Sequence, residues 1–470
     1  MRTFTTLAAA SATILGANAI NLVERRDGSA PKVVQHETQR REDLGNILQR
    51  DRARLRKRQS HTVQDSLDNE ETLYFMNVTI GTPPQTLRLH VDTGSSDLWV
   101  NVANSQLCQT SGDPCDVSGT YNANSSTSYQ YINSDFNISY VDGSGSAGDY
   151  VSDDVSFGGV TLQNQQFGIG YTSSSQEGIL GIGYPLNEVA VAYNGGQPYP
   201  NVPQSLVQGG HIGSNAYSLW LNDLDASTGS ILFGGVNSAK YTGELQTLPV
   251  IQEQGYYAEF IIALTAVGAN GTTGSIATHV NSPALLDSGS SLMYLPDSIA
   301  QDIFTAVGAR YDSSQGAAFV DCALANSDQT IDFTFSSPTI RVAMNELVIV
   351  AGYQRNRPVC ILGIGPAGDS TPVLGDTFLR SAYVVYDLHN NEISLAQTNF
   401  NSTTDDIHEI SNSTGVPDAT AVASAVTSVA IATGGGRIND QPSVTSTAFA
   451  MPTAAVGYGA ALLGAVAFAL

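Results

Sequence analysis

The sequence is poor in charged residues and in cysteine. Asp, Glu, Lys and Arg make up only 13% of its 470 residues, well below the usual quarter, which disfavours long solvated helices. Four cysteines are too few for a disulfide-dense miniprotein but suit an ordinary secreted enzyme with two bridges. Gly, Ser, Thr and Asn are abundant instead, and this composition favours β-structure with many turns.

Basic side chains are scarce after residue 58. Residues 1–58 hold 12 of the 20 Lys and Arg residues and six of the 43 Asp and Glu residues, so the remainder has 8 basic and 37 acidic side chains, a net charge of −29. Nucleic acid is therefore not an expected partner. Acidic surroundings neutralise carboxylates and lower their mutual repulsion, so we expect a mildly acidic working environment.

The N-terminal region has the composition of processing segments. Residues 1–19 combine Arg2, an apolar run and the triplet Ala17-Asn18-Ala19, a pattern typical of a secretory signal peptide. Residues 20–58 carry a net charge of +5 and end in a dibasic Lys-Arg pair. We interpret them as an inhibitory propeptide that docks on the acidic body at neutral pH and loosens as carboxylates protonate. A basic nucleic-acid arm is the alternative.

The C-terminal region changes composition after residue 400. Residues 401–445 are rich in Ser, Thr, Ala and Val without strand-sized apolar blocks, which predicts a stalk that need not pack. Residues 446–470 end in an uncharged stretch, 454–470, with three glycines, which is short for a membrane span. Together with small residues upstream, this tail suggests a GPI-attachment signal and a place at the cell surface, on plasma membrane or wall. A true tail anchor is the alternative.

Between these ends the chain alternates short apolar runs with turn residues. Residues 74–80 and 383–386 have the length and composition of strands, and Gly, Asn, Asp and Pro separate such runs. One segment, 297–308, keeps a helical period. The body is therefore expected to be all-β, in two lobes over residues 59–245 and 246–400.

A six-residue motif occurs twice in this body. Val-Asp-Thr-Gly-Ser-Ser at 91–96 recurs as Leu-Asp-Ser-Gly-Ser-Ser at 286–291, and an apolar pair followed by Gly comes later at 179–181 and 373–375. The Asp and the later Gly are 89 residues apart in the first copy and 88 in the second. Two copies with matched downstream partners indicate duplicated lobes.

The repeated motif suits acid–base chemistry by two carboxyl groups. If a twofold axis relates the lobes, Asp92 and Asp287 meet at their interface. Two like charges about 4 Å apart repel by roughly 4 kcal/mol at an effective dielectric near 20, so the pair holds one proton over a wide acidic range. The ionised member can act as general base on a water while the protonated member donates to the scissile carbonyl. No metal or cofactor is required.

The region from residue 73 to 400 resembles the pepsin family of aspartic proteases, and most closely the fungal secreted and GPI-anchored, yapsin- or candidapepsin-like members. The motifs that carry the resemblance lie at residues 92–100, 138–144, 177–181, 287–291 and 374–376. The resemblance implies a bilobal all-β fold with two pseudo-twofold-related lobes and an interlobe cleft. The shared-proton dyad described above is the established pattern for this family.

The resemblance also implies roles for single residues. Asp92 and Asp287 become the catalytic pair, Tyr140 becomes the flap tyrosine that closes over substrate, and Trp99 becomes its packing and hydrogen-bonding partner. The residues expected to orient the two carboxylates are Gly94, Ser95, Gly289 and Ser290. The sequence departs from the common pattern at Ser288 and Ser290, where many relatives have Thr, and at Val141, where Gly is frequent.

Asp142 and Gly143 follow the flap tyrosine and are further substrate-binding candidates. Asp142 could pair with a basic substrate side chain, and the acidic surface favours the same preference. The alternative is an ordinary turn, because Asp before Gly is a strong turn pair by itself. Cleavage beside Lys or Arg is therefore a hypothesis.

The four cysteines allow three connectivities, and the resemblance implies one bridge per lobe, Cys108–Cys115 and Cys322–Cys360. A metal site is not expected, since no His lies at ligand spacing beside them. Among six Asn-x-Ser/Thr sequons, those at Asn124, Asn270, Asn401 and Asn412 are glycosylation candidates in a secreted protein. Asn77 and Asn137 lie in strand-like runs near the expected catalytic residues, and we expect them to stay unmodified.

The sequence thus predicts an aspartic endopeptidase that is made as a secreted zymogen and cleaves polypeptides as a monomer at acidic pH. The alternative is a catalytically inactive pepsin-like cell-surface binding protein. Replacement of either Asp or of the flap Tyr would favour that alternative, and all three residues are present. A structural wall glycoprotein would account for the Ser/Thr-rich tract but not for the paired motifs.

Overall fold

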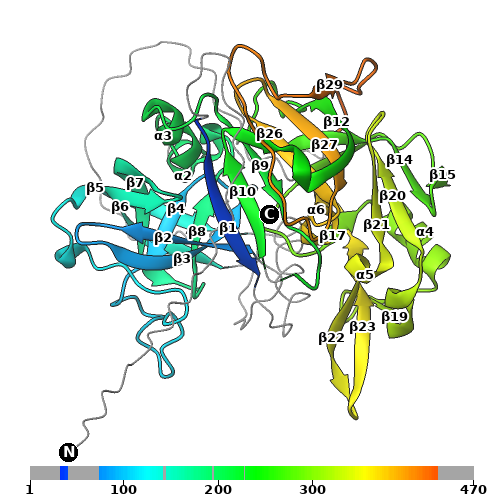
Figure 1. Cartoon of the computed structure of the whole chain (residues 1–470). Coiled ribbons are helices and arrows are strands. Elements are labelled where there is room, and N and C mark those ends of the chain that lie inside the picture. The colour runs from blue at the N-terminus through cyan, green and yellow to red at the C-terminus, as the bar shows by residue number, and fades with distance from the viewer. Residues whose placement is uncertain (1–31, 41–73, 141–143, 193–194, 227, 432–470) are drawn as a thin grey trace, which may run out of the picture.

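The computed structural model describes residues 32–40, 74–140, 144–192, 195–226 and 228–431 (Figure 1). The expected signal peptide (1–19), the expected GPI signal (446–470), Asp142 and Gly143 lie outside the described residues, as does most of the expected propeptide (20–58). Strands dominate the described chain, as the sequence predicts. The longest described helix, α4 (Asp297–Val307), has 11 residues and covers the segment with helical period. No described helix is long and apolar enough to cross a membrane.

The N-terminal lobe is built on one end of a large sheet. Its strands are β2 (Tyr74–Ile80), β3 (Gln85–Asp92), β4 (Leu98–Asn101), β5 (Gln130–Ser139), β6 (Gly145–Phe157), β7 (Val160–Ser173) and β8 (Gly178–Gly181), in the spatial order β2-β3-β8-β4-β7-β6-β5. Leu87, Leu89 and Val91 of β3 are buried, so an apolar strand leads the chain directly to Asp92.

The same sheet continues through strands from both halves of the chain. These are β9 (Ala216–Trp220), β10 (Thr228–Phe233), β12 (Tyr241–Pro249), β26 (Ala382–Asp387) and β27 (Glu392–Thr398). Their order is β12-β27-β26-β9-β10, and β26 pairs antiparallel with β9. This connecting sheet joins the two lobes seen on either side of it in Figure 1.

The C-terminal lobe holds three smaller sheets. Their strands are β13 (Ile261–Leu264), β14 (Ala266–Ala269), β15 (Thr272–Ala277), β16 (Ser282–Leu286), β17 (Met293–Leu295), β18 (Arg310–Asp312), β19 (Ala317–Val320), β20 (Thr330–Thr334), β21 (Thr339–Ala343), β22 (Val348–Gln354), β23 (Arg357–Leu362), β24 (Ile364–Pro366) and β25 (Val373–Leu374). The short helices of the described chain are α2 (Val189–Ala192), α3 (Val202–Gln208), α5 (Met344–Leu347) and α6 (Asp376–Leu379).

The two motif copies lie in the same strand arrangement. In the N-terminal lobe the order is β3-β8-β4-β7, and in the C-terminal lobe it is β16-β25-β17-β24. In both sets the first pair is parallel, the second antiparallel and the third parallel. Equal order and equal direction confirm that the duplicated motifs belong to duplicated lobes.

One described segment of the expected propeptide is a strand. β1 (Val34–Arg40) lies between β10 and β2, pairing six residues with β10 and two with β2, all antiparallel. Figure 1 shows it crossing the front of the molecule between the lobes. Residues 34–40 are thus part of the same sheet that joins the two lobes.

Residues 401–431 differ from the expectation of a stalk that need not pack. β28 (Ile407–Glu409) pairs with β11 (Gly235–Asn237), and β29 (Ala419–Ala421) adds to β12 in parallel. Ile407 and Ile410 are fully buried. Single apolar residues and a free sheet edge suffice for this docking, so the lack of strand-sized apolar blocks did not reveal it.

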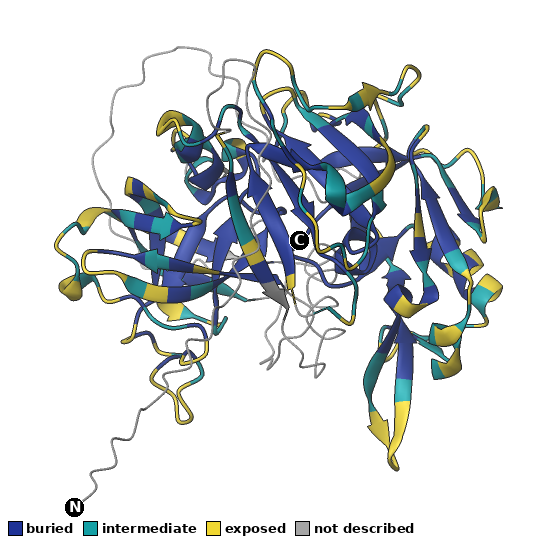
Figure 2. Cartoon of the chain, in the orientation of Figure 1, coloured by how far each residue is buried: buried dark blue, intermediate teal, exposed yellow. Residues whose placement is uncertain are grey.

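Buried residues concentrate in the strands of both lobes and of the connecting sheet, while exposed residues gather in the loops (Figure 2). Both expected disulfides are confirmed: Cys108–Cys115 and Cys322–Cys360 form, each with Cα atoms 5.2 Å apart. Each bridge lies within one lobe, so neither constrains the lobes relative to each other.

Candidate active site

Asp92 and Asp287 occupy equivalent places at the ends of apolar strands. Asp92 ends β3 and pairs in register with Gly181 of β8. Asp287 follows β16, and its backbone N–H donates to the carbonyl of Leu374 at 3.2 Å. Both aspartates are at most 1% exposed. Each lobe therefore delivers one carboxyl group from the same position of the same strand pattern.

Each carboxylate receives the same pair of hydrogen bonds from its own loop. The glycine two residues later donates its backbone N–H to Oδ1, and the serine three residues later donates its hydroxyl to Oδ2. The distances are 2.8 Å (Gly94) and 2.5 Å (Ser95) to Asp92, and 2.8 Å (Gly289) and 2.9 Å (Ser290) to Asp287. The two loops therefore hold their carboxyl groups with the same set of donors.

The two glycines show how closely the loops approach each other. A Cβ atom on Gly94 would lie 2.5 Å from Asp287 Oδ1. A Cβ atom on Gly289 would lie 2.9 Å from Asp287 Oδ1 and closer still to Asp92 Oδ1. Both inner oxygens are therefore within 3 Å of a single point. Only glycine permits this approach, because any side chain would push the carboxylates apart.

Thr93 and Ser288 link the two loops directly. The Thr93 N–H donates to Ser288 Oγ at 3.1 Å, and the Ser288 N–H donates to Thr93 Oγ1 at 2.9 Å. The hydroxyls in turn donate across the interface, Thr93 to the Leu286 carbonyl at 3.0 Å and Ser288 to the Val91 carbonyl at 2.9 Å. This reciprocal set fixes the two loops relative to each other. The sequence signal was a hydroxyl residue at the same position of both motif copies.

His90 makes a further contact across the same interface. Its ring is buried, and Nε2 lies 3.2 Å from the carbonyl oxygen of Ser288. Because a carbonyl oxygen only accepts, Nε2 carries the hydrogen of this bond. The sequence does not reveal this role of His90, since a single histidine in an apolar strand has no distinctive spacing.

The expected flap is a hairpin of β5 and β6, and Tyr140 lies at its tip. Tyr140 is 1% exposed, and its hydroxyl accepts from Trp99 Nε1 at 2.5 Å, with the ring centroids 6.3 Å apart. The tyrosine and the tryptophan therefore lie together as the resemblance implies. The structure does not describe Asp142 or Gly143.

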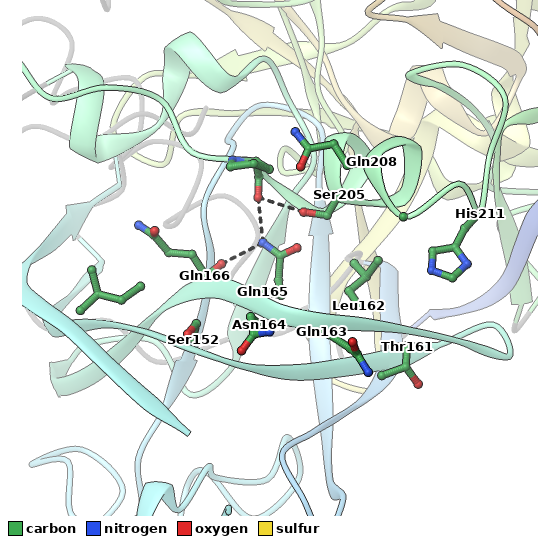
Figure 3. A pocket seen from close by; sticks show the side chains of 13 residues that line it. Ser152, Thr161, Leu162, Gln163, Asn164, Gln165, Gln166, Ser205, Gln208 and His211 are labelled. Atoms are coloured by element: carbon green, nitrogen blue, oxygen red, sulfur yellow. Dashed lines mark hydrogen bonds between the residues drawn. The ribbon is translucent and has the colours of Figure 1, made fainter. Parts of the chain in front are cut away.

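A separate pocket of about 590 Å³ lies on the N-terminal lobe between β7 and α3 (Figure 3). Amides and hydroxyls dominate its lining, and Gln165 Nε2 donates to the carbonyls of Pro200 and Gln166 at 2.9 and 3.0 Å. No residue of either Asp motif lines it. This pocket is therefore not where the paired carboxyl groups could act.

A model of the eukaryotic aspartyl protease family matches residues 73–398. The chain belongs to this family. It is 54% identical over 447 residues to the probable aspartic-type endopeptidase opsB of Aspergillus oryzae, covering 92% of this chain and 91% of that protein. It is 41% identical over 345 residues to secreted aspartic protease 8 of Candida albicans, covering 72% and 79%.

A solved structure supports the same fold for this aspartyl protease. The crystal structure of the aspartic proteinase from Irpex lacteus superposes with a TM-score of 0.60, covering 80% of this chain and all of that one. At 22% identity this likeness shows the fold alone. The pepsin-like bilobal fold and the assignment as an aspartic endopeptidase, a hydrolase of polypeptides, are confirmed.

The sequons of the protease are all on its surface. The side chains of the four glycosylation candidates Asn124, Asn270, Asn401 and Asn412 are exposed, and so are those of Asn77 and Asn137. Exposure thus does not separate the two groups, and their modification stays a prediction.

Proposed function

We propose that Asp92 and Asp287 together activate the water that hydrolyses the peptide bond. The observation that carries this proposal is the approach of both Oδ1 atoms to one point between two matching sets of donors. Each serine hydroxyl holds the outer oxygen of its own aspartate, so the inner oxygens are left facing each other. A water held between them would contact both carboxyl groups at once.

The chemistry follows from the mutual repulsion of the two carboxylates. Two charges this close in a buried site do not both ionise at acidic pH, so the pair retains one proton. The ionised member accepts a proton from water as it attacks the carbonyl carbon, and the protonated member donates to the carbonyl oxygen. The newly protonated member then gives its proton to the leaving nitrogen as the C–N bond breaks, and the ionised member takes a proton from a hydroxyl of the tetrahedral diol, which restores the singly protonated dyad.

The test compares the wild-type protein with Asp92→Asn. Both are expressed as the full zymogen and incubated at about pH 4 with an unstructured protein substrate. We expect the variant to lose at least about 10²-fold in cleavage rate, the lower end of what a general acid–base group supplies. Asp113→Asn is the matched control, because Asp113 lies exposed in a loop. Equal cleavage by wild type and Asp92→Asn would refute the assignment.

We also propose that the protease is made as a secreted zymogen, with a signal peptide at 1–19 and an inhibitory propeptide at 20–58. The pairing of β1 with β10 supports this, since residues 34–40, a part of the segment ahead of the Lys57-Arg58 pair, are held on the body of the protease. The name of the Candida relative supports secretion. Mass spectrometry of the secreted protein tests the first mature residue, and a mature chain beginning before Val34 would contradict removal of the propeptide.

The remaining proposals concern surface attachment and specificity. We propose lobes at 59–245 and 246–400, a C-terminal extension at 401–445, and a tail at 446–470 that is exchanged for a GPI anchor. Release of the protein from cells by phosphatidylinositol-specific phospholipase C would support the anchor. A preference for Lys or Arg at the cleavage site rests on Asp142 and the acidic surface. A peptide library without enrichment of Lys or Arg beside the scissile bond would remove it.

A further inference from the structure

Two buried carboxyl groups in the N-terminal lobe take no part in the proposed reaction. Asp97 lies directly before β4 and is 1% exposed, and Glu188 lies directly before α2 and is 0% exposed. Neither side chain forms an ion pair with any residue that the structure describes. Buried acids without a cation are rare, because a buried charge has to be paired or neutralised.

Asp97 connects three separate segments through hydrogen bonds. Its Oδ1 accepts from the hydroxyls of Tyr150 and Tyr199, both at 2.8 Å, and its Oδ2 accepts from the backbone N–H of Val189 at 2.8 Å. Tyr150 belongs to β6, the return strand of the flap hairpin. Asp97 therefore ties the flap to the segment that follows the Asp92 motif.

Glu188 lies beside this network with only one of its oxygens satisfied. Oε2 accepts from the backbone N–H of Tyr199 at 2.9 Å, whereas Oε1 is buried without a hydrogen-bond partner among the described residues. An ionised carboxylate would leave that oxygen charged and unsolvated, so the protonated form fits the site. Burial, together with the charge of Asp97, raises the pKa of Glu188 to about 10.

Two titratable groups face this pair, Tyr150 of β6 and Tyr199 of the loop before α3, and both are acids. Burial raises the pKa of Asp97 too, but Val189, Tyr150 and Tyr199 oppose that shift by donating hydrogen bonds. Burial and the charge of Asp97 also raise the pKa values of the phenols of Tyr150 and Tyr199, so both remain donors. Asp97 has three hydrogen-bond donors to stabilise a negative charge and Glu188 has only one, so Glu188 is the member that keeps its proton to the higher pH.

A chain of ring contacts leads from Asp97 to the flap tip. The Tyr150 ring lies edge-on to Phe136 of β5 at 5.3 Å, and Phe136 lies 6.4 Å from Trp99. Trp99 in turn contacts Tyr140. All of these rings belong to one buried cluster that also contains Tyr199. The position of the flap tyrosine, Tyr140, therefore depends on the packing of the rings that contact Asp97 and its neighbours.

We propose that Asp97 and Glu188 are positioning residues that fix the flap hairpin on the N-terminal lobe for as long as Glu188 keeps its proton. The proposal rests on the proposed function only in naming the flap as the substrate cover. Opening of the flap base exposes Glu188 to water, where its carboxyl group ionises as an ordinary glutamate does. Opening therefore becomes easier as pH rises above the ordinary glutamate pKa, and it continues to become easier up to the folded-state pKa.

The size of the effect follows from this linkage. Between the two pKa values the open population grows about tenfold for each pH unit. From about pH 4.5 to pH 7 this amounts to roughly 10²-fold. Glu188→Gln keeps the shape of the side chain and its acceptor for the Tyr199 N–H but removes the titration. Glu244→Gln is the matched control, since Glu244 is fully exposed on β12.

The experiment incubates the secreted protein at pH values from 4 to 7.5 and then assays peptide cleavage at pH 4. We expect the inactivation rate of wild type and Glu244→Gln to rise steeply above about pH 5. For Glu188→Gln we expect a nearly flat profile, with a half-life at pH 7 at least tenfold longer than that of wild type. Equal profiles for Glu188→Gln and wild type would overturn the proposal.

Hydrogen exchange of the wild-type protein supplies a second readout that needs no variant. The protection of β6 amides, corrected for intrinsic exchange, should fall as pH rises from 4.5 to 7, more than that of the β26 amides in the connecting sheet. Equal pH dependence in both strands would also overturn the proposal. If no cleavage depends on Asp92 at any pH, the proposed function fails, while the exchange measurement still decides the role of Glu188.

Discussion

Replacement of Gly94 by Ala is expected to remove most of the activity while the protein still folds. The new Cβ would lie 2.5 Å from Asp287 Oδ1 and 2.8 Å from its Cγ. Atoms in favourable non-bonded contact lie about 3.5 Å apart, so the Ala methyl and the Asp287 carboxylate must separate by about 1 Å. The backbone at Gly94 is not left-handed, so the substitution acts through this contact and not through backbone strain.

The magnitude follows from the required displacement. A misplacement of about 1 Å in a reacting group can cost about 10²-fold in rate, which corresponds to about 2.7 kcal/mol of barrier. The extra methyl group costs about 1–3 kcal/mol of stability as overpacking. This loss is smaller than the stability of a typical folded protein, about 5–15 kcal/mol, so the variant remains folded at room temperature.

The assay measures kcat and KM on a quenched fluorescent peptide at about pH 4, together with Tm. We expect kcat to fall about 100-fold and KM to change little. Gly289→Ala should give the same result, because its Cβ would press on Asp92 Oδ1. Gly209→Ala is the control, since its new Cβ would meet mainly the partly exposed side chain of His211, which can move aside. If Gly94→Ala keeps more than a tenth of the wild-type kcat, the close approach of the loops is wrong.

Three other variants test further contacts. Tyr140→Phe leaves the buried indole N–H of Trp99 without its acceptor. An unsatisfied buried donor costs about 1–3 kcal/mol, so we expect kcat/KM to fall about tenfold. Unchanged kinetics would contradict a role for this hydrogen bond. Removal of the Cys322–Cys360 disulfide, which spans 38 residues, should lower the free energy of unfolding in urea by about 4 kcal/mol. Removal of Cys108–Cys115, which spans 7 residues, should lower it by about 2.4 kcal/mol. Glu346→Gln should lower the free energy of unfolding by about 3–5 kcal/mol, because Arg380 stays buried without its ion-pair partner. The double variant Glu346→Leu/Arg380→Met should lose less stability than the sum of the losses of Glu346→Leu and Arg380→Met alone. Additive losses would contradict the ion pair.

The architecture could be predicted from the sequence because its strongest signals are local. The two motif copies, the equal intervals to the later glycines and the short apolar runs identified two β lobes with one Asp in each. What the sequence could not give is how the loops fit together. The contacts between Thr93 and Ser288 join residues 195 positions apart, and no local pattern specifies which of many hydroxyls will meet.

The buried acidic pair escaped the sequence analysis for a related reason. Asp97 is part of a motif that carried the family resemblance, yet nothing in its neighbourhood shows that Tyr150 and Tyr199 will donate to it. Glu188 comes directly after a turn-forming Pro-Leu-Asn segment, and a glutamate in such a place normally faces water. Its burial results from packing between α2 and the flap base, which is a property of the folded lobe.

The C-terminal extension shows the limit of judging packing by composition. Residues 401–431 have no strand-sized apolar block, but Ile407 and Ile410 meet a surface that is already formed. A segment that docks on a finished fold needs only a few anchors and a free strand edge, whereas a segment that forms its own core needs many. Composition therefore predicts whether a tract can fold alone, and it does not predict whether the tract will pack.

The protease has two pairs of buried carboxyl groups, Asp92 with Asp287 and Asp97 with Glu188. In both pairs two like charges would repel each other, and the two sites differ in how they meet this repulsion. Asp92 and Asp287 have matching donors, as the proposed exchange of a proton between them requires. Asp97 has three donors and Glu188 has one, so the proton stays on Glu188. Matching donors suit a pair that exchanges its proton in every turnover, and unequal donors suit a pair that has to remain in one state. The proposed dyad needs a proton that an acidic medium supplies, and the negative charge on the surface of the protease is also lowest in such a medium.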